Sequence, residues 1–155
     1  TDLMASLSNA PLDEAEAPAT SQRFPRASLQ GLVVLVVDDE LDVADLFRQQ
    51  FRREVRQGHY VMHFSHSAEE ALDKMQHGLD PELLVVLSDI NMPGMDGLGL
   101  LQEVRQRRAD LPVIMVRAYG DDARRDQAAK LGAAGFVTKP VDFDSLKQEL
   151  KRVLA

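Results

Sequence analysis

The stretch Leu-Val-Val-Leu-Val-Val-Asp-Asp-Glu at residues 32–40 joins six consecutive apolar residues to three consecutive carboxylates. An apolar run of this length, without polar alternation, is typical of a strand that is buried on both faces. Such strands occur mainly in parallel sheets that carry helices on both sides. The stretch therefore predicts an α/β domain, and it puts acidic side chains directly after the first strand.

The same pattern recurs along the rest of the chain. Further strands are predicted at residues 60–64, 83–87, 113–116 and 136–138. Apolar residues at helical spacing predict helices at residues 43–55, 68–75, 98–104, 121–131 and 143–154. Ser67 and Asp142 are expected to cap the helices that follow them. Five strands alternating with five helices predict a doubly wound parallel sheet in three α/β/α layers.

Composition separates the first thirty residues from the rest. Residues 9–20 are rich in Ala, Pro and acidic residues, which predicts an arm or linker over residues 1–30 and a folded domain over residues 31–155. The absence of cysteine excludes disulfide scaffolds, thiolate zinc sites and cysteine nucleophiles. The net charge of −7 gives no support to nucleic-acid binding, and no apolar run approaches the roughly 20 residues that cross a bilayer. We expect a soluble, cytoplasmic protein.

Functional side chains are expected where the strands end, because ligands of such folds bind at the carboxyl ends of the strands. Asp38 and Asp39 follow the first apolar run, Asp89 follows the third, and Lys139 follows the fifth. Two carboxylates about 4 Å apart repel each other by roughly 4 kcal/mol at an effective dielectric near 20. A cluster of them requires raised pKa values or a compensating cation, and hard carboxylate oxygens near solvent suit Mg²⁺.

An aspartate beside a divalent cation and an ammonium can attack phosphorus and form an aspartyl-phosphate. Motifs of competing chemistries are missing from the sequence: the Gly-x-x-x-x-Gly-Lys-Ser/Thr loop, the Gly-x-Ser-x-Gly elbow and the His-Glu-x-x-His pair. An aspartate-based phosphatase would require a second aspartate two residues after the nucleophile, where Asn91 stands. A Mg²⁺-dependent phosphomonoesterase is therefore the more distant, enzymatic alternative.

Four motifs in this order resemble the receiver domain of response regulators, the phosphoacceptor part of two-component signalling. They are Val-Val-Asp-Asp-Glu (36–40), Ser-Asp-Ile-Asn-Met-Pro-Gly-Met-Asp-Gly (88–97), Ala-Tyr-Gly-Asp (118–121) and Gly-Phe-Val-Thr-Lys-Pro (135–140). The resemblance extends from about residue 31 to residue 154. It implies a flavodoxin-like, CheY-like fold with strand order 2-1-3-4-5, and a signalling switch rather than a turnover enzyme.

The resemblance also implies roles for individual residues. Asp89 would be the phosphoacceptor, and Lys139 would pair first with Asp89 and then with the phosphoryl group. Asp39 would bind Mg²⁺ directly and Asp38 mainly through metal-bound water. Asp89 and the main-chain carbonyl of Asn91 would complete the protein ligands. The family also makes the peptide bond between residues 139 and 140 cis.

Two positions concern the switch. Phe136 matches the aromatic residue whose rotamer reports the state in this family, and it lacks the hydroxyl of the more common Tyr. Arg117 stands where the family has Thr or Ser, whose hydroxyl bonds a phosphoryl oxygen. We expect Arg117 to pair with Asp89 at rest and with the phosphoryl oxygens after transfer. This pairing predicts slow phosphorylation and a long-lived phosphorylated state.

The expected partners follow from the same resemblance. A sensor histidine kinase or phosphotransfer protein would donate the phosphoryl group. An output domain or partner protein would contact the face formed by the fourth helix, fifth strand and fifth helix. We expect no direct nucleic-acid binding and no membrane contact, and a homodimer remains open. The alternative function is a constitutive, phosphorylation-independent interaction module locked by Arg117. The sequence leaves open whether the chain is stand-alone or excised from a larger protein.

Overall fold

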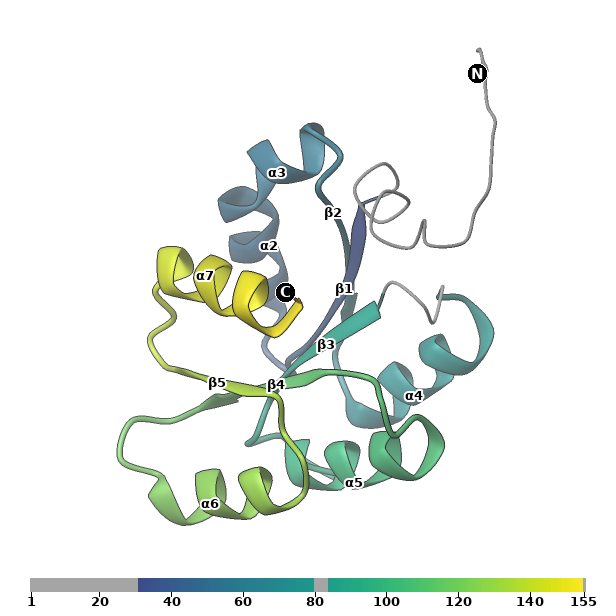
Figure 1. Cartoon of the computed structure of the whole chain (residues 1–155), viewed down its shortest axis with the longest axis vertical. Coiled ribbons are helices and arrows are strands. Elements are labelled where there is room, and N and C mark those ends of the chain that lie inside the picture. Colours follow the sequence, from purple (N-terminus) through teal and green to yellow (C-terminus); the bar gives the residue numbers. More distant parts are fainter. Residues whose placement is uncertain (1–30, 80–83, 155) are drawn as a thin grey trace.

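The computed structural model describes residues 31–79 and 84–154, so the expected arm at residues 1–30 lies outside the described residues. The described residues contain one five-stranded parallel sheet with the strand order β2-β1-β3-β4-β5, as predicted (Figure 1). Its strands are β1 (Leu32–Val37), β2 (Tyr60–Ser65), β3 (Leu84–Asp89), β4 (Val113–Arg117) and β5 (Gly135–Thr138).

Helices cover both faces of the sheet, with α2, α3 and α7 on one face and α4, α5 and α6 on the other (Figure 1). Their bounds are α2 (Leu41–Gln50), α3 (Arg52–Arg56), α4 (Ala68–His77), α5 (Gly97–Arg107), α6 (Asp122–Lys130) and α7 (Phe143–Leu154). The three-layer α/β/α architecture is therefore confirmed. None of the described helices is long and apolar enough to span a membrane.

The prediction of a single helix over residues 43–55 is wrong in one respect, because the backbone leaves the helical conformation at Phe51. Its φ and ψ angles are −104° and 9°, which separates α2 from α3. The Phe51 ring is fully buried, with ring centroids 5.9 Å from Phe47, 5.6 Å from Tyr60 and 6.2 Å from Phe143. The backbone thus leaves the helical conformation at a residue whose ring packs against α2, β2 and α7.

The apolar runs of the strands fill two cores, one on each face of the sheet. Val34 and Val36 of β1 pack with α2 and α7, whereas Val33, Leu35 and Val37 pack on the opposite side with α4 and α5. This alternation explains why the run carries no polar residue, since both sides of the strand face helices. The buried sheet holds the carboxyl ends of the strands side by side.

Local signals fix the starts of the helices near those strand ends. Ser67 Oγ accepts a hydrogen bond from the Glu70 N–H (3.0 Å), and Asp142 Oδ1 accepts one from the Asp144 N–H (3.0 Å), which confirms both predicted caps. Gly97 begins α5, and a Cβ atom there would lie 2.2 Å from the carbonyl oxygen of Asp89. The missing side chain of Gly97 therefore lets α5 start directly against the end of β3.

Candidate functional site

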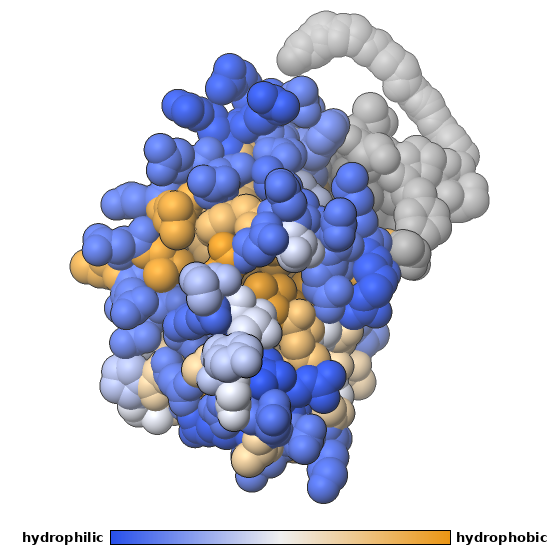
Figure 2. Space-filling model, turned by 90° about the vertical axis from the view of Figure 1, so that its left-hand side faces the viewer, coloured by the Kyte–Doolittle hydropathy of each residue, from blue (hydrophilic) through white to orange (hydrophobic). Residues whose placement is uncertain are grey.

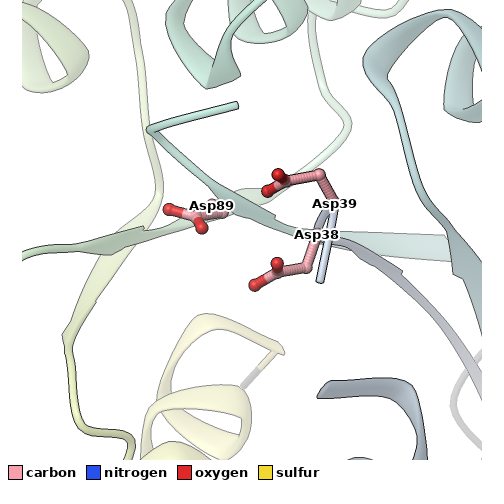
Figure 3. Close-up of side chains that lie close together, drawn as sticks. All are labelled: Asp38, Asp39 and Asp89. Atoms are coloured by element: carbon pink, nitrogen blue, oxygen red, sulfur yellow. The ribbon is translucent and has the colours of Figure 1, made fainter. Parts of the chain in front are cut away.

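The three acidic residues singled out in the sequence meet at the carboxyl edge of the sheet. Asp38 and Asp39 follow β1, and Asp89 is the last residue of the neighbouring strand β3. One carboxylate oxygen of each residue lies within 4.8 Å of the others. Figure 3 shows the side chains of Asp38 and Asp39 reaching from the end of β1 toward the side of Asp89. Asp38 and Asp89 are buried, whereas Asp39 is exposed to solvent.

Lys139 reaches the same cluster from the far side of β4. Its Nζ donates a hydrogen bond to Asp89 Oδ2 (2.6 Å) and lies 4.0 Å from Asp38 Oδ2. Its backbone N–H donates to the Arg117 carbonyl (2.9 Å), which continues the β4–β5 pairing and fixes the base of the side chain. The peptide bond between Lys139 and Pro140 is cis, as the resemblance implied.

Among the described residues of the cluster, three carboxylates meet the single ammonium group of Lys139, so like charges lie close together. Burial raises the pKa of Asp38, and the charge of Asp89 adds to this, against a hydrogen bond from the Glu40 N–H and the charge of Lys139. For Lys139, burial lowers the pKa, but the hydrogen bond and charge of Asp89, together with the charges of Asp38 and Glu40, outweigh burial and raise it. Lys139 is therefore held in its charged form, while the ionised state of Asp38 is disfavoured.

The donor set fits a magnesium ion. The converging ligand atoms are hard carboxylate oxygens, which Mg²⁺ prefers, and the exposed carboxylate of Asp39 leaves the cluster open to water. The loop after β3 folds back so that the Asn91 N–H donates to Asp89 Oδ1 (3.1 Å). The backbone N–H of Asn91 thus lies beside the carboxylate of Asp89.

An apolar pocket adjoins the carboxylates on the α2–α7 side. Asp38, Asp89 and Lys139 line it together with Val43 and Phe143. Figure 2 views the side of the molecule on which β4 and β5 run into their following loops, and it shows hydrophobic side chains gathered among hydrophilic ones. The exposed apolar residues of α2 are Leu41 and Leu46. The carboxylate–lysine cluster thus borders an apolar surface.

Arg117 does not take the partner that we expected from the sequence. Its Nη2 donates to Asp122 Oδ1 (2.7 Å) in the first turn of α6, and its side chain is 13% exposed. Both carboxylate oxygens of Asp89 already accept hydrogen bonds, from Lys139 and from the Asn91 N–H. The carboxylate of Asp122, only five residues along the chain, offers an ion pair nearer to solvent. The pairing with Asp89 is therefore replaced by one with α6.

Phe136 lies in β5 on the side of the sheet that faces α4, α5 and α6. The residue is half-buried and packs against the core of that side. The Arg125 guanidinium of α6 lies 4.6 Å from the centre of its ring, within the range of a cation–π contact. The Phe136 N–H donates to Glu149 Oε2 of α7 (3.2 Å). Phe136 therefore contacts both helices of the face at which we expected a partner to bind.

Arg124 is the residue of this region that sequence reasoning missed. From the first turn of α6 its guanidinium bonds Asn91 Oδ1 and, at 2.8 Å, Asp96 Oδ2. These acceptors lie 33 and 28 residues away in the sequence. No local pattern signals such a contact, because it depends on how the loop after β3 and the start of α6 approach each other in the folded sheet.

The fold and the site together define a CheY-like doubly wound α/β domain with an aspartate–lysine cluster at its carboxyl edge. The chain belongs to the response regulator receiver domain family, whose family model matches residues 34–151.

Similar proteins come from several signalling systems. The chain is 34% identical over 121 residues to the transcriptional regulatory protein ResD of Bacillus subtilis, covering 78% of this chain and 47% of ResD. It is 33% identical over 144 residues to the sensor kinase CckA of Brucella abortus, covering 92% of this chain and 15% of CckA. The chain thus spans less than half the length of these relatives.

Solved structures show the same domain. The receiver domain of NtrX from Brucella abortus superimposes with a TM-score of 0.68 at 32% identity, covering 78% of this chain and 97% of that one. The chemotaxis protein CheY4 of Vibrio cholerae superimposes with a TM-score of 0.69 at 26% identity, covering 79% and 98%. These nearly complete coverages of single receiver domains confirm the predicted fold class.

Proposed function

We propose that the chain accepts a phosphoryl group on Asp89 from a phosphohistidine of a sensor histidine kinase or phosphotransfer protein. The observation that carries the proposal is the hydrogen bond of 2.6 Å from Lys139 to Asp89, with two further carboxylates within 4.8 Å. This arrangement joins a nucleophile, a fixed cation and a set of hard oxygen ligands at one point. Membership of the receiver family supports the same role.

The transfer step forms one bond and breaks one. An oxygen of the Asp89 carboxylate attacks phosphorus, and the new O–P bond forms while the P–N bond to the donor imidazole breaks. The electron pair of the P–N bond stays on the imidazole nitrogen. The Asn91 N–H and Lys139 Nζ hold the two oxygens of Asp89, so the carboxylate enters the reaction with a fixed orientation. Lys139 then stabilises the charge on the phosphoryl oxygens.

We propose Asp38, Asp39, Asp89 and the main-chain carbonyl of Asn91 as the residues that would hold Mg²⁺. When bound, the ion supplies positive charge to the phosphoryl oxygens. Asp39 is the exposed member of the set and lies at the opening toward solvent. Asp38 is buried at a raised pKa, and a nearby cation would favour its ionised form. The chain is an acceptor and a switch, and we do not assign it turnover as an enzyme.

Partners contact the domain at two surfaces in this proposal. The phosphodonor covers the apolar pocket beside Asp89, where Leu41 and Leu46 of α2 are exposed. An output domain, a partner protein or a second copy of the chain contacts the face of α6, β5 and α7. We place this exchange in the cytoplasm, and we assign the chain no direct contact with nucleic acid or membrane.

A second candidate function is a constitutive interaction module. The ion pair between Arg117 and Asp122 favours it, because Arg117 has no hydroxyl and is already held by α6. In this case the face of α6, β5 and α7 keeps one conformation whether or not Asp89 is modified. The same ion pair removes our reason to expect slow phosphorylation, since Arg117 is bound away from the nucleophile.

Intact mass spectrometry after incubation with acetyl phosphate, with Mg²⁺ or with EDTA, tests the proposal. We expect the parent protein to gain one phosphoryl group in Mg²⁺, and Asp89→Asn to gain none. Asp45→Asn removes a carboxylate that is 82% exposed and pairs with the surface residue Arg48, so it should label like the parent. Labelling of Asp89→Asn at the parent's level would refute the acceptor assignment. Absence of labelling in the parent would favour the constitutive module, and rapid multiple turnover would favour the phosphomonoesterase.

A further inference from the structure

The contact between Arg124 and the loop after β3 connects the phosphoacceptor strand to α6. The two bonds of the guanidinium end on different residues of this loop, Asn91 and Asp96. The side chains of Arg124 and Asp96 are 34% and 30% exposed, so the ion pair is partly shielded from water. A planar guanidinium that bonds two fixed acceptors holds both in one relative geometry.

Both acceptors are themselves bonded to the ends of secondary structure elements. The backbone N–H of Asn91 donates to Asp89 Oδ1 (3.1 Å), and Asp96 Oδ1 accepts from the Gly99 N–H (2.9 Å) at the start of α5. One side chain therefore links α6 to the phosphoacceptor through Asn91 and to the cap of α5 through Asp96. A change in the loop that turns Asn91 or Asp96 must either carry Arg124 with it or break these bonds.

Apolar packing holds α6 only weakly, so the position of this helix depends more on these polar contacts. Ala128 is the single buried residue of α6, although packing of an apolar face supplies most of the stability of a helix in a protein. The first turn of α6 is bonded from two sides, by Arg117 to Asp122 and by Arg124 to Asn91 and Asp96. The position of this turn thus depends on charged bonds to β4 and to the loop after β3.

We propose that Arg124 is the positioning residue that couples the loop of residues 90–96 to α6. The proposal rests on the proposed function, because phosphorylation of Asp89 is what changes the loop. Arg117 offers no hydroxyl to the phosphoryl group and is bound to Asp122, so the bonds of Arg124 provide a second physical route from the site to this helix. Because the guanidinium joins α6 to Asn91 and Asp96, its removal releases the loop as well as the helix.

Hydrogen–deuterium exchange of segments 90–96 and 121–131, in EDTA and in Mg²⁺, tests the link. We expect Arg124→Gln to accelerate exchange in both segments by roughly fivefold or more, the lower end of typical coupling. Lys130→Gln removes the same charge from the other end of α6 and should leave both segments at the parent's rates. Arg124→Lys keeps the charge but loses the planar fork, so its exchange should fall between parent and Arg124→Gln. Circular dichroism confirms that each variant is folded.

A double-mutant cycle separates coupling from a merely structural role. Asn91→Ala should accelerate exchange of segment 121–131 in the parent, and should have little further effect once Arg124 is Gln. Additive effects of the two substitutions would overturn the route through Asn91, because they would mean that Asn91 and Arg124 act on α6 independently. An unchanged α6 in Arg124→Gln would overturn the proposal as a whole.

Acetyl phosphate with Mg²⁺ completes the test, with intact mass recorded on the same samples. We expect phosphorylation to change exchange in segment 121–131 of the parent, and to leave that of Arg124→Gln unchanged at equal phosphoryl content. An equal response of both proteins would overturn the coupling role. If the parent gains no phosphoryl group, the proposed function fails, while the comparison in EDTA still decides whether Arg124 joins the loop to α6.

Discussion

Neutralising Asp38 should stabilise the protein in the absence of divalent cations, although most substitutions of buried residues destabilise a fold. Asp38→Asn keeps the size of the side chain and the oxygen that accepts the hydrogen bond from the Glu40 N–H (2.9 Å). The substitution removes a buried carboxyl group whose pKa is raised, mainly by burial and further by the charge of Asp89. The ionised form of Asp38 therefore costs free energy in the folded state at neutral pH.

The magnitude follows from the distances in the cluster. A pair of charges no more than 4.8 Å apart repels by about 3.5 kcal/mol at an effective dielectric of 20, which is the repulsion between Asp38 and Asp89. The attraction between Asp38 and Lys139 at 4.0 Å is about 4 kcal/mol by the same relation. The repulsion and the attraction nearly cancel, and the repulsion from Asp39, which is as close but exposed, is screened by solvent. The remaining effect is mainly the cost of burying the Asp38 charge, offset in part by its hydrogen bond. We expect a net gain of about 1–2 kcal/mol.

Thermal and urea unfolding in EDTA, followed by circular dichroism, measure this gain. It corresponds to an increase in Tm of about 4–8 °C for a domain of this size. Mg²⁺ at a hundredfold excess over its Kd would stabilise the parent by about 2.7 kcal/mol, and Asp38→Asn should lose most of this increment. The variant is thus the more stable protein in EDTA, and its advantage should disappear in saturating Mg²⁺. Asp73→Asn, a change at a largely exposed surface pair, should alter stability by less than about 0.5 kcal/mol.

The pH dependence of stability tests the same buried charge. Between the ordinary pKa of Asp38 and its raised pKa in the folded state, the folded protein binds more protons than the unfolded chain, so stability falls as pH rises through this window. Below both values Asp38 is neutral in either state, and the advantage of Asp38→Asn should vanish. An Asp38→Asn protein that is less stable than the parent in EDTA at neutral pH would refute the reasoning.

Two further predictions concern stability. Gly97→Ala should cost about 3 kcal/mol in urea unfolding, since its Cβ would lie 2.2 Å from the Asp89 carbonyl and 2.7 Å from Ile90 Cα; a loss below about 1 kcal/mol would contradict this. Glu54 accepts a hydrogen bond from Lys147 that lowers its pKa, so this pair stabilises above the ordinary pKa and is lost as pH falls through the lowered one. Glu54→Gln should therefore cost about 0.5 kcal/mol at pH 7 and nothing in acid, whereas an equal cost at both pH values would exclude the ion pair as its cause.

Most of the fold could be predicted because both faces of the sheet are buried. The apolar runs predicted each described strand to within two residues. The strands β2, β3 and β4 extend beyond the predicted ends into polar side chains, and β5 begins one residue early, at Gly135. Thus β3 continues through Ser88 to Asp89, so the expected acceptor is the last residue of the strand rather than part of the loop. The break at Phe51 could not be predicted, since the spacing of apolar residues runs through it without interruption.

Part of the candidate site could likewise be predicted from the sequence, and part could not. The positions of Asp38, Asp89 and Lys139 follow from strand ends that a parallel sheet brings to one edge, so the order of the sequence places them. The partners of Arg117 and Arg124 do not follow from it, because a long guanidinium side chain reaches several carboxylates and selects among them only in the folded geometry. Sequence patterns therefore located the carboxylate–lysine cluster but not its connections to α6.

The residues that would accept the phosphoryl group are therefore distinct from those that would transmit its effect to α6. Asp89 and Lys139 would accept and stabilise a phosphoryl group whether or not α6 responds, because neither bonds that helix directly in the contacts of the described residues. In our proposal the response of α6 depends instead on the bonds of Arg124, while the ion pair between Arg117 and Asp122 holds the same turn of the helix. A phosphorylated switch and a constitutive module thus share the same acceptor site. They differ in whether the bonds from α6 to Asn91 and Asp96 persist once Asp89 carries phosphate.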